Sequence, residues 1–132
     1  MLVRNDVPEN IQTDAKVDVD AKKVMADSAY MKRIMGNLIS NAVQAMPDGG
    51  KLAIRAHREV GDVVITVEDT GVGIPDEAKP KLFQPLFTTK SKGQGFGLAV
   101  VKRLTEALNG TITFDSQEGK GTKFIIKLPI GR

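Results

Sequence analysis

Cysteine and tryptophan are missing from the 132 residues, tyrosine occurs once, and aromatic residues make up only 5%. Without cysteine there is no disulfide, thiolate nucleophile or thiolate ligand, which fits a cytoplasmic setting. The few aromatics and the scattered basic residues provide neither a base-stacking platform nor a basic stripe, so we expect no nucleic-acid partner despite a net charge of +3. No apolar run approaches the roughly 20 residues of a membrane span, and we expect no direct membrane contact.

The chain does have the length and the patterning of a single α+β domain over residues 1–132. Short alternating apolar runs are typical of strands, and apolar residues at three- and four-residue spacing are typical of helices. The apolar run that ends at Asp69 is expected to be the central strand. We expect strands at 10–19, 22–26, 51–58, 63–69, 111–115 and 122–128, and helices at 27–46, 76–83 and 98–108.

The long helix carries three amides on one face: Asn37, Asn41 and Gln44, at i, i+4 and i+7. Asparagine inside a helix costs several tenths of a kcal/mol (about 0.5) relative to alanine, and a solvated face more often carries Glu and Lys. This face is therefore expected to bind a ligand. Amide oxygens suit Mg²⁺ that bridges phosphates, and an incidental polar face is the alternative.

Two glycine-spaced loops are the other candidate sites. In the loop 69–73, the carboxylate of Asp69 ends an apolar strand and can accept hydrogen bonds from an exocyclic amine, while the glycines admit a flat ligand, so adenine would suit it. Gly93, Gly95 and Gly97 precede a helix whose N-terminus favours an anion. The second loop is neither a Walker loop nor a dinucleotide fingerprint, because its glycines follow a loop instead of a strand. An ordinary turn is the alternative for each of the two loops alone.

The amide face, the loop 69–73 and the later glycine cluster follow one another along the chain in a fixed order. With this order the sequence resembles the ATP-binding catalytic domain of sensor histidine kinases, within the gyrase, Hsp90, histidine kinase and MutL superfamily. The resemblance spans about residues 20–129, and four boxes in order at suitable spacing are highly specific. The boxes are the N box at 37–42, the first glycine box at 69–74, the F box at 82–90 and the second glycine box at 93–98, with the matching EGKGTKF at 118–124. Residues 41–46 and 87–90 resemble the nitrogen-regulation and dicarboxylate-sensing branch in particular.

The resemblance implies a two-layer α/β sandwich, the Bergerat fold, with three helices on one face of a mixed, mainly antiparallel sheet. Mg-ATP would bind between the helices and a mobile lid at about residues 75–97. Such domains transfer the γ-phosphoryl group to a histidine on a separate dimerisation domain, and a response regulator receives it in turn. We expect a monomeric fragment without the phosphoacceptor and sensor domains, from a parent kinase that can be membrane-anchored.

Carried over by position, the resemblance implies that Asp69 receives the adenine amino group, helped by Thr122 and water. Gly71 and Gly73 would leave room for the ring. The remaining expected nucleotide contacts are Gln44, Ile74, Phe87, Thr88, Thr89, Lys90, Gly93, Gly95, Phe96, Gly97 and Leu98.

The same carry-over implies that Asn41 coordinates Mg²⁺ with Asn37 beside it, and that these two residues serve catalysis. ATPases of the superfamily carry a glutamate general base where this chain has Asn37, so the resemblance implies a phosphotransferase instead of a hydrolase. Gln94 and Phe96 depart from the usual second glycine box.

The single histidine, His57, lacks a following acidic residue and is expected to be a surface strand residue instead of a phosphoacceptor. Two alternatives remain open: an anti-sigma-factor-type serine kinase of the same fold, and a nucleotide-sensing or structural module without catalysis.

Overall fold

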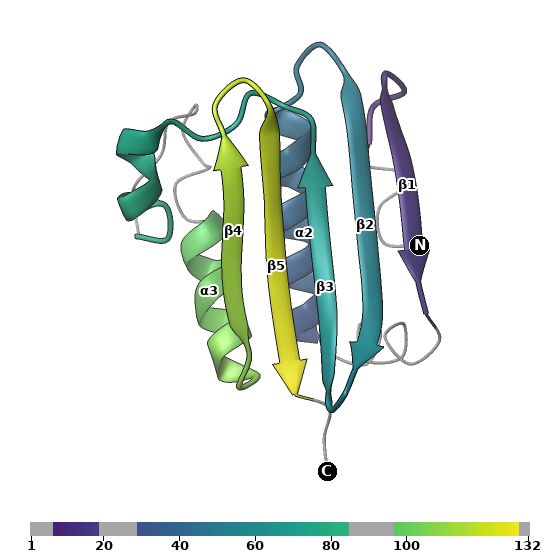
Figure 1. Ribbon diagram of the computed structural model, residues 1–132, viewed down its shortest axis with the longest axis vertical. Helices are drawn as coiled ribbons and strands as arrows, with labels where there is room; N and C mark the ends of the chain where they lie inside the picture. The colour runs from purple at the N-terminus through teal and green to yellow at the C-terminus, as the bar shows by residue number, and fades with distance from the viewer. Residues whose placement is uncertain (1–6, 19–28, 85–96, 130–132) are drawn as a thin grey trace.

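The computed structural model describes residues 7–18, 29–84 and 97–129, which form one five-stranded sheet with helices behind it (Figure 1). The sheet order is β1-β2-β3-β5-β4, and β1 pairs in parallel with β2 while the other pairs are antiparallel. The strands are β1 (Ile11–Val17), β2 (Gly50–Glu59), β3 (Asp62–Asp69), β4 (Thr111–Gln117) and β5 (Gly121–Pro129). The helices are α2 (Ala29–Gln44), the 3-10 helix η2 (Asp76–Lys81) and α3 (Gly97–Ala107). The predicted α+β architecture is confirmed.

The strands follow the sequence pattern closely. β3 is central, as its apolar run indicates, and β1 is an edge strand. The closing hairpin is longer than predicted, because Ser116 and Gln117 still belong to β4 and pair with Thr122 and Gly121. The strand expected at 22–26 lies outside the described residues.

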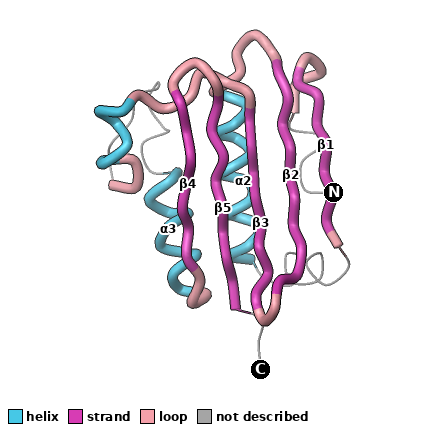
Figure 2. Tube along the Cα trace, in the orientation of Figure 1, coloured by secondary structure: helices cyan, strands magenta, loops and turns pink. Residues whose placement is uncertain are grey.

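The core lies between the sheet and the two α-helices, which pack side by side on one face (Figure 2). α2 buries the apolar arc that its periodicity predicts, and α3 adds Val101 and Thr105, whose hydroxyl donates to the Val101 carbonyl. Each fully buried aliphatic side chain contributes about 2 kcal/mol. The largest fully buried apolar residues are Met31, Ile34, Met35, Leu38, Leu52, Ile65, Ile126, Val63, Val67 and Val101.

α3 ends at Ala107, within one residue of the predicted boundary at 108. Asn109 adopts a left-handed conformation with φ 64°, and the Gly110 amide donates to the Thr105 carbonyl at 2.9 Å. This arrangement satisfies carbonyls at the helix C-terminus. Within the described segments, neither α-helix has the length and apolarity needed to cross a bilayer.

The β2–β3 turn places Val60 in the left-handed region, with φ 50° and a side chain that is 99% exposed. A β-branched residue is strained there, whereas Asn-Gly is the preferred pair for a two-residue hairpin turn. We therefore expect Val60→Asn to stabilise the fold by about 1 kcal/mol, measured as a rise in thermal midpoint of about 4 °C. Val72→Asn, at another exposed valine, is the control, and an equal rise there would contradict the strain at Val60.

Candidate functional site

Three polar side chains form a row at the end of the sheet that is uppermost in Figure 1. Asp69 of β3 lies opposite Thr122 of β5, and Thr122 lies opposite Ser116 of β4. Asp69 and Thr122 are each only 6% exposed, while Ser116 is half-buried. Buried polar groups require hydrogen-bond partners, so this row is a local polar site at the margin of an apolar core.

The loop after Asp69 lies between Ala45, the residue that follows α2, and the β4–β5 hairpin. The Gly71 amide donates to Asp69 Oδ1 at 2.8 Å, which folds the loop back onto the carboxylate. The Val72 amide donates to the Ala45 carbonyl at 3.0 Å, and the Gly119 amide donates to the Val72 carbonyl at 2.7 Å. The first glycine box is therefore fixed by backbone contacts on both sides.

The glycines of this region are required by neighbouring protein backbone. A Cβ at Gly71 would overlap the Ala45 carbonyl, and one at Gly73, where φ is +76°, would overlap the Gln117 carbonyl. The family resemblance implies that both glycines leave room for a ligand ring. The contacts give a second reason for glycine at both positions, which is the close approach of the backbone of Ala45 and of β4 to the loop.

The amide face of α2 lies beside the start of α3. Asn37 Nδ2 donates to the Gly97 carbonyl at 3.3 Å, which joins the N box to the end of the second glycine box. Asn41 is half-buried on the same face. Gln44 is exposed, and its Nε2 lies 3.5 Å from the Ser40 hydroxyl. The helix N-terminus that favours anions is thus held against the asparagine face.

The first part of the predicted lid is anchored to the sheet. Lys79 of η2 donates to the Ser116 carbonyl at 2.7 Å, and Phe83 packs edge-on against Phe114 and Phe124 with ring centroids 5.8 and 6.4 Å apart. Leu98 and Ile74 also pack against the core. The remaining predicted contacts lie outside the described residues: Phe87, Thr88, Thr89, Lys90, Gly93, Gly95 and Phe96.

Sequence reasoning missed Ser116 and Lys79. Ser116 stands one residue beyond the strand predicted at 111–115, next to a glycine-containing turn, and Lys79 is one of many lysines. The pairing of β4 with β5 gives Ser116 its place in the polar row. Only the register of two strands could have identified it, because a serine carries no spacing signal of its own.

Away from this site, the described residues form an open hollow but no cluster of metal-ligating side chains. No group of three His, Cys, Asp or Glu side chains converges there on a common metal position. An open hollow of about 540 Å³ lies over β1 and β2 and is lined by none of the predicted site residues.

His57 is exposed on β2, as predicted. Its Nε2 lies 3.0 Å from Glu59 Oε2, and this hydrogen bond lowers the pKa of the Glu59 carboxyl.

Comparison with known proteins identifies the domain type. Residues 26–132 match the family model described as "Histidine kinase-, DNA gyrase B-, and HSP90-like ATPase". The chain is 40% identical over 108 residues to the sensor histidine kinase ZraS of Escherichia coli (strain K12), which covers 82% of this chain and 23% of that kinase. The chain therefore spans about a quarter of the length of this relative.

Two solved structures share the fold. The catalytic domain of the histidine kinase ThkA, in a nucleotide-free form, is 32% identical with a TM-score of 0.77, covering 91% of this chain and 79% of that one. Full-length ShkA in complex with AMPPNP is 27% identical with a TM-score of 0.74, covering 90% of this chain and 25% of that one.

These relatives do not favour the serine-kinase or the non-catalytic alternative, and the nitrogen-regulation and dicarboxylate-sensing sub-branch stays a prediction. The family match, the sensor-kinase relatives and the shared fold agree. The chain belongs to the histidine kinase-, DNA gyrase B- and HSP90-like ATPase family, and within it is an ATP-binding catalytic domain homologous to those of sensor histidine kinases.

Proposed function

We propose that this domain binds Mg-ATP and donates the γ-phosphoryl group to a histidine on the dimerisation domain of its parent kinase, in the cytoplasm, from where a response regulator is phosphorylated. The observation that carries the proposal is the buried Asp69 carboxylate, 6% exposed and in register with the Thr122 hydroxyl. A buried carboxylate is stabilised by donors. The adenine amino group is a donor of the right size at this strand end.

The phosphates would lie against the asparagine face of α2 and the N-terminus of α3. The 3.3 Å bond between Asn37 and Gly97 supports this arrangement, since it brings both elements together. Asn41, half-buried one turn further along the helix, offers an amide oxygen of the type that Mg²⁺ accepts. When bound, Mg²⁺ would neutralise charge on the phosphates.

The identity of residue 37 favours transfer over hydrolysis. Asn37 donates its amide hydrogen to the Gly97 carbonyl. An ionised glutamate has no hydrogen to donate and would face that carbonyl with a negative charge. The described site therefore presents no carboxylate at position 37 to activate water, and the attacking group would be the imidazole nitrogen of the partner domain. A bond forms between that nitrogen and the γ-phosphorus, the bond to the bridging oxygen breaks, and ADP leaves.

The test combines binding, hydrolysis and transfer. Calorimetric titration of the 132-residue chain should show ATP binding that strengthens with Mg²⁺, whereas hydrolysis should remain slow. Addition of a histidine-bearing dimerisation domain should yield an acid-labile, base-stable phosphoryl label on that domain. Asn41→Asp should weaken Mg-ATP binding about tenfold, because it adds a negative charge beside the phosphates. Fast hydrolysis by the chain alone, or labelling of serine, would contradict the proposal.

A further inference from the structure

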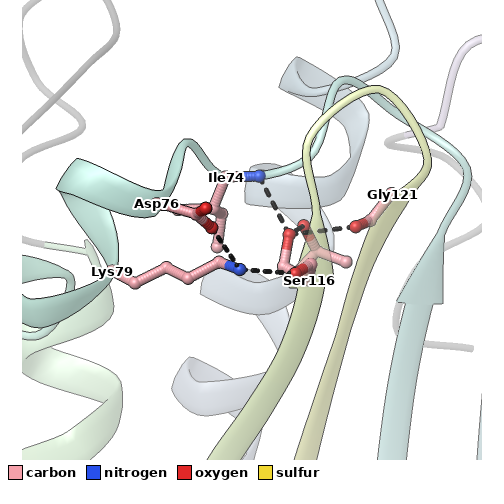
Figure 3. Close-up of polar contacts among 6 residues, drawn as sticks. Ile74, Asp76, Lys79, Ser116 and Gly121 are labelled. Carbon is pink, nitrogen blue, oxygen red and sulfur yellow. Dashed lines mark hydrogen bonds and ion pairs between the residues drawn. The ribbon is translucent and has the colours of Figure 1, made fainter.

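The Ser116 hydroxyl lies at the meeting point of three chain segments (Figure 3). The Ile74 amide donates to Ser116 Oγ at 2.9 Å, the Gly121 carbonyl lies 3.0 Å from it, and Thr122 Oγ1 lies 2.9 Å from it. These contacts come from the end of the first glycine box and from the start of β5. Ser116 therefore touches the candidate adenine site without being an expected ligand contact.

The three contacts together determine the direction of each hydrogen bond. A serine hydroxyl has one proton and two lone pairs. The Gly121 carbonyl has no proton, so that contact is a hydrogen bond only if Ser116 donates. The two lone pairs then accept from the Ile74 amide and from the Thr122 hydroxyl. This assignment satisfies all three contacts, and it directs the proton of Thr122 toward Ser116.

The Thr122 hydroxyl consequently presents only lone pairs to a ligand. Its neighbour in register is the Asp69 carboxylate, which is also an acceptor. Two adjacent acceptors favour a ligand group that donates, and they oppose one that only accepts. A 6-amino purine supplies two N–H hydrogens at this position, whereas a 6-oxo purine supplies a carbonyl oxygen.

Ser116 is also held in place from its main chain. Lys79 Nζ donates to the Ser116 carbonyl at 2.7 Å and pairs with Asp76 at 2.9 Å. Figure 3 shows the Lys79 side chain of η2 reaching across to Ser116 on β4. The serine is thus fixed on both its side chain and its backbone, and the hydrogen-bond directions around it are preorganised before a ligand arrives.

We propose that Ser116 is a positioning residue that makes Thr122 an acceptor and so selects 6-amino over 6-oxo purine nucleotides. The proposal rests on the proposed function, because it assumes that a purine base contacts Asp69 and Thr122. In Ser116→Ala the Thr122 proton is released and can be donated to a 6-oxo group. One gained or lost hydrogen bond corresponds to about a fivefold change in affinity.

The experiment measures dissociation constants for ATP and inosine triphosphate, which differ at position 6 of the purine, at constant Mg²⁺. The dissociation constant for inosine triphosphate divided by that for ATP should fall about fivefold in Ser116→Ala. This ratio should stay unchanged in Ser116→Thr, which keeps the hydroxyl. Thr113→Ala, at an exposed threonine of the same strand, is the matched control. If Ser116→Ala does not fold, Ser116→Cys replaces it, since sulfur is a weak acceptor for the Thr122 proton.

A double-mutant cycle then shows whether Ser116 acts through Thr122. In a Thr122→Val background, Ser116→Ala should leave the ratio unchanged. Equal weakening of both nucleotides by Ser116→Ala would mean a merely structural role and would overturn the inference. A fall in the ratio that persists without the Thr122 hydroxyl would overturn it as well. A wild-type chain that binds neither nucleotide overturns the proposed function itself, which separates the two failures.

Discussion

Asp69→Asn is expected to reduce ATP affinity about 100-fold while leaving the fold intact. The carboxylate is buried, and a hydrogen bond to a charged group is worth about 2–3 kcal/mol. The Gly71 amide already donates to Asp69 Oδ1, so in the variant the amide oxygen would take that place. The amide NH₂ would then face the adenine amino group, donor against donor. Calorimetric titration with ATP measures the loss.

Two comparisons make this expectation specific. Asp115→Asn, at an exposed carboxylate of β4, removes the same charge from the same end of the sheet and should leave ATP affinity unchanged. Inosine triphosphate should lose much less affinity in Asp69→Asn than ATP does, because its 6-oxo group can accept from the new NH₂. A folded Asp69→Asn variant that binds ATP within threefold of the wild type would show that this carboxylate does not contact the base.

Gly121→Ala is expected to be the most destabilising of the substitutions considered. The glycine has φ +119°, and a Cβ there would overlap the Asp69 carbonyl of the neighbouring strand. Backbone strain and overpacking add, and we expect a loss of about 4 kcal/mol in the free energy of unfolding. Urea titration should show a much lower midpoint, and Asp69 would be displaced with the strand that carries it.

Gly119→Ala is the matched control for this effect. Gly119 lies two residues earlier in the same hairpin with φ +84°, but no atom lies within 4 Å of the Cβ it would gain. Only the conformational strain remains, which is about 1 kcal/mol for an alanine in the left-handed region. Equal losses in the two variants would mean that the close approach of Gly121 to Asp69 does not contribute.

Sequence patterning was sufficient for the helices and the centre of the sheet. The apolar arc of α2 and the continuous apolar run of β3 are local signals, because the spacing of the buried residues along the chain distinguishes a helix from a strand. The end of α3 also follows a local signal, because asparagine is one of the few residues that adopt a left-handed conformation, as Asn109 does there.

The missed features depend on contacts between distant segments. Ser116 and Gln117 resemble turn residues, and only their pairing with β5 extends the strand to them. The spacing of Gly71 and Gly73 indicates a close approach, but it does not say whether a ligand or the protein's own backbone approaches. The order of the motifs predicted the site. The three hydrogen bonds of the Ser116 hydroxyl could not be predicted from the sequence, because they depend on how three chain segments lie in space.

The length of the β4–β5 turn sets the register of the strands that carry the site. Residues 118–120 connect β4 to β5 so that Ser116, Thr122 and Asp69 lie in one row. Because side chains alternate between the faces of a strand, a slip of one residue would turn all polar groups of one strand to the opposite face. Surface turns usually tolerate insertions. Here, one extra residue that shifted the register would expose Thr122 and remove it from the polar row that is proposed to contact the base. The part of the chain that sets specificity is therefore constrained in length as much as in composition.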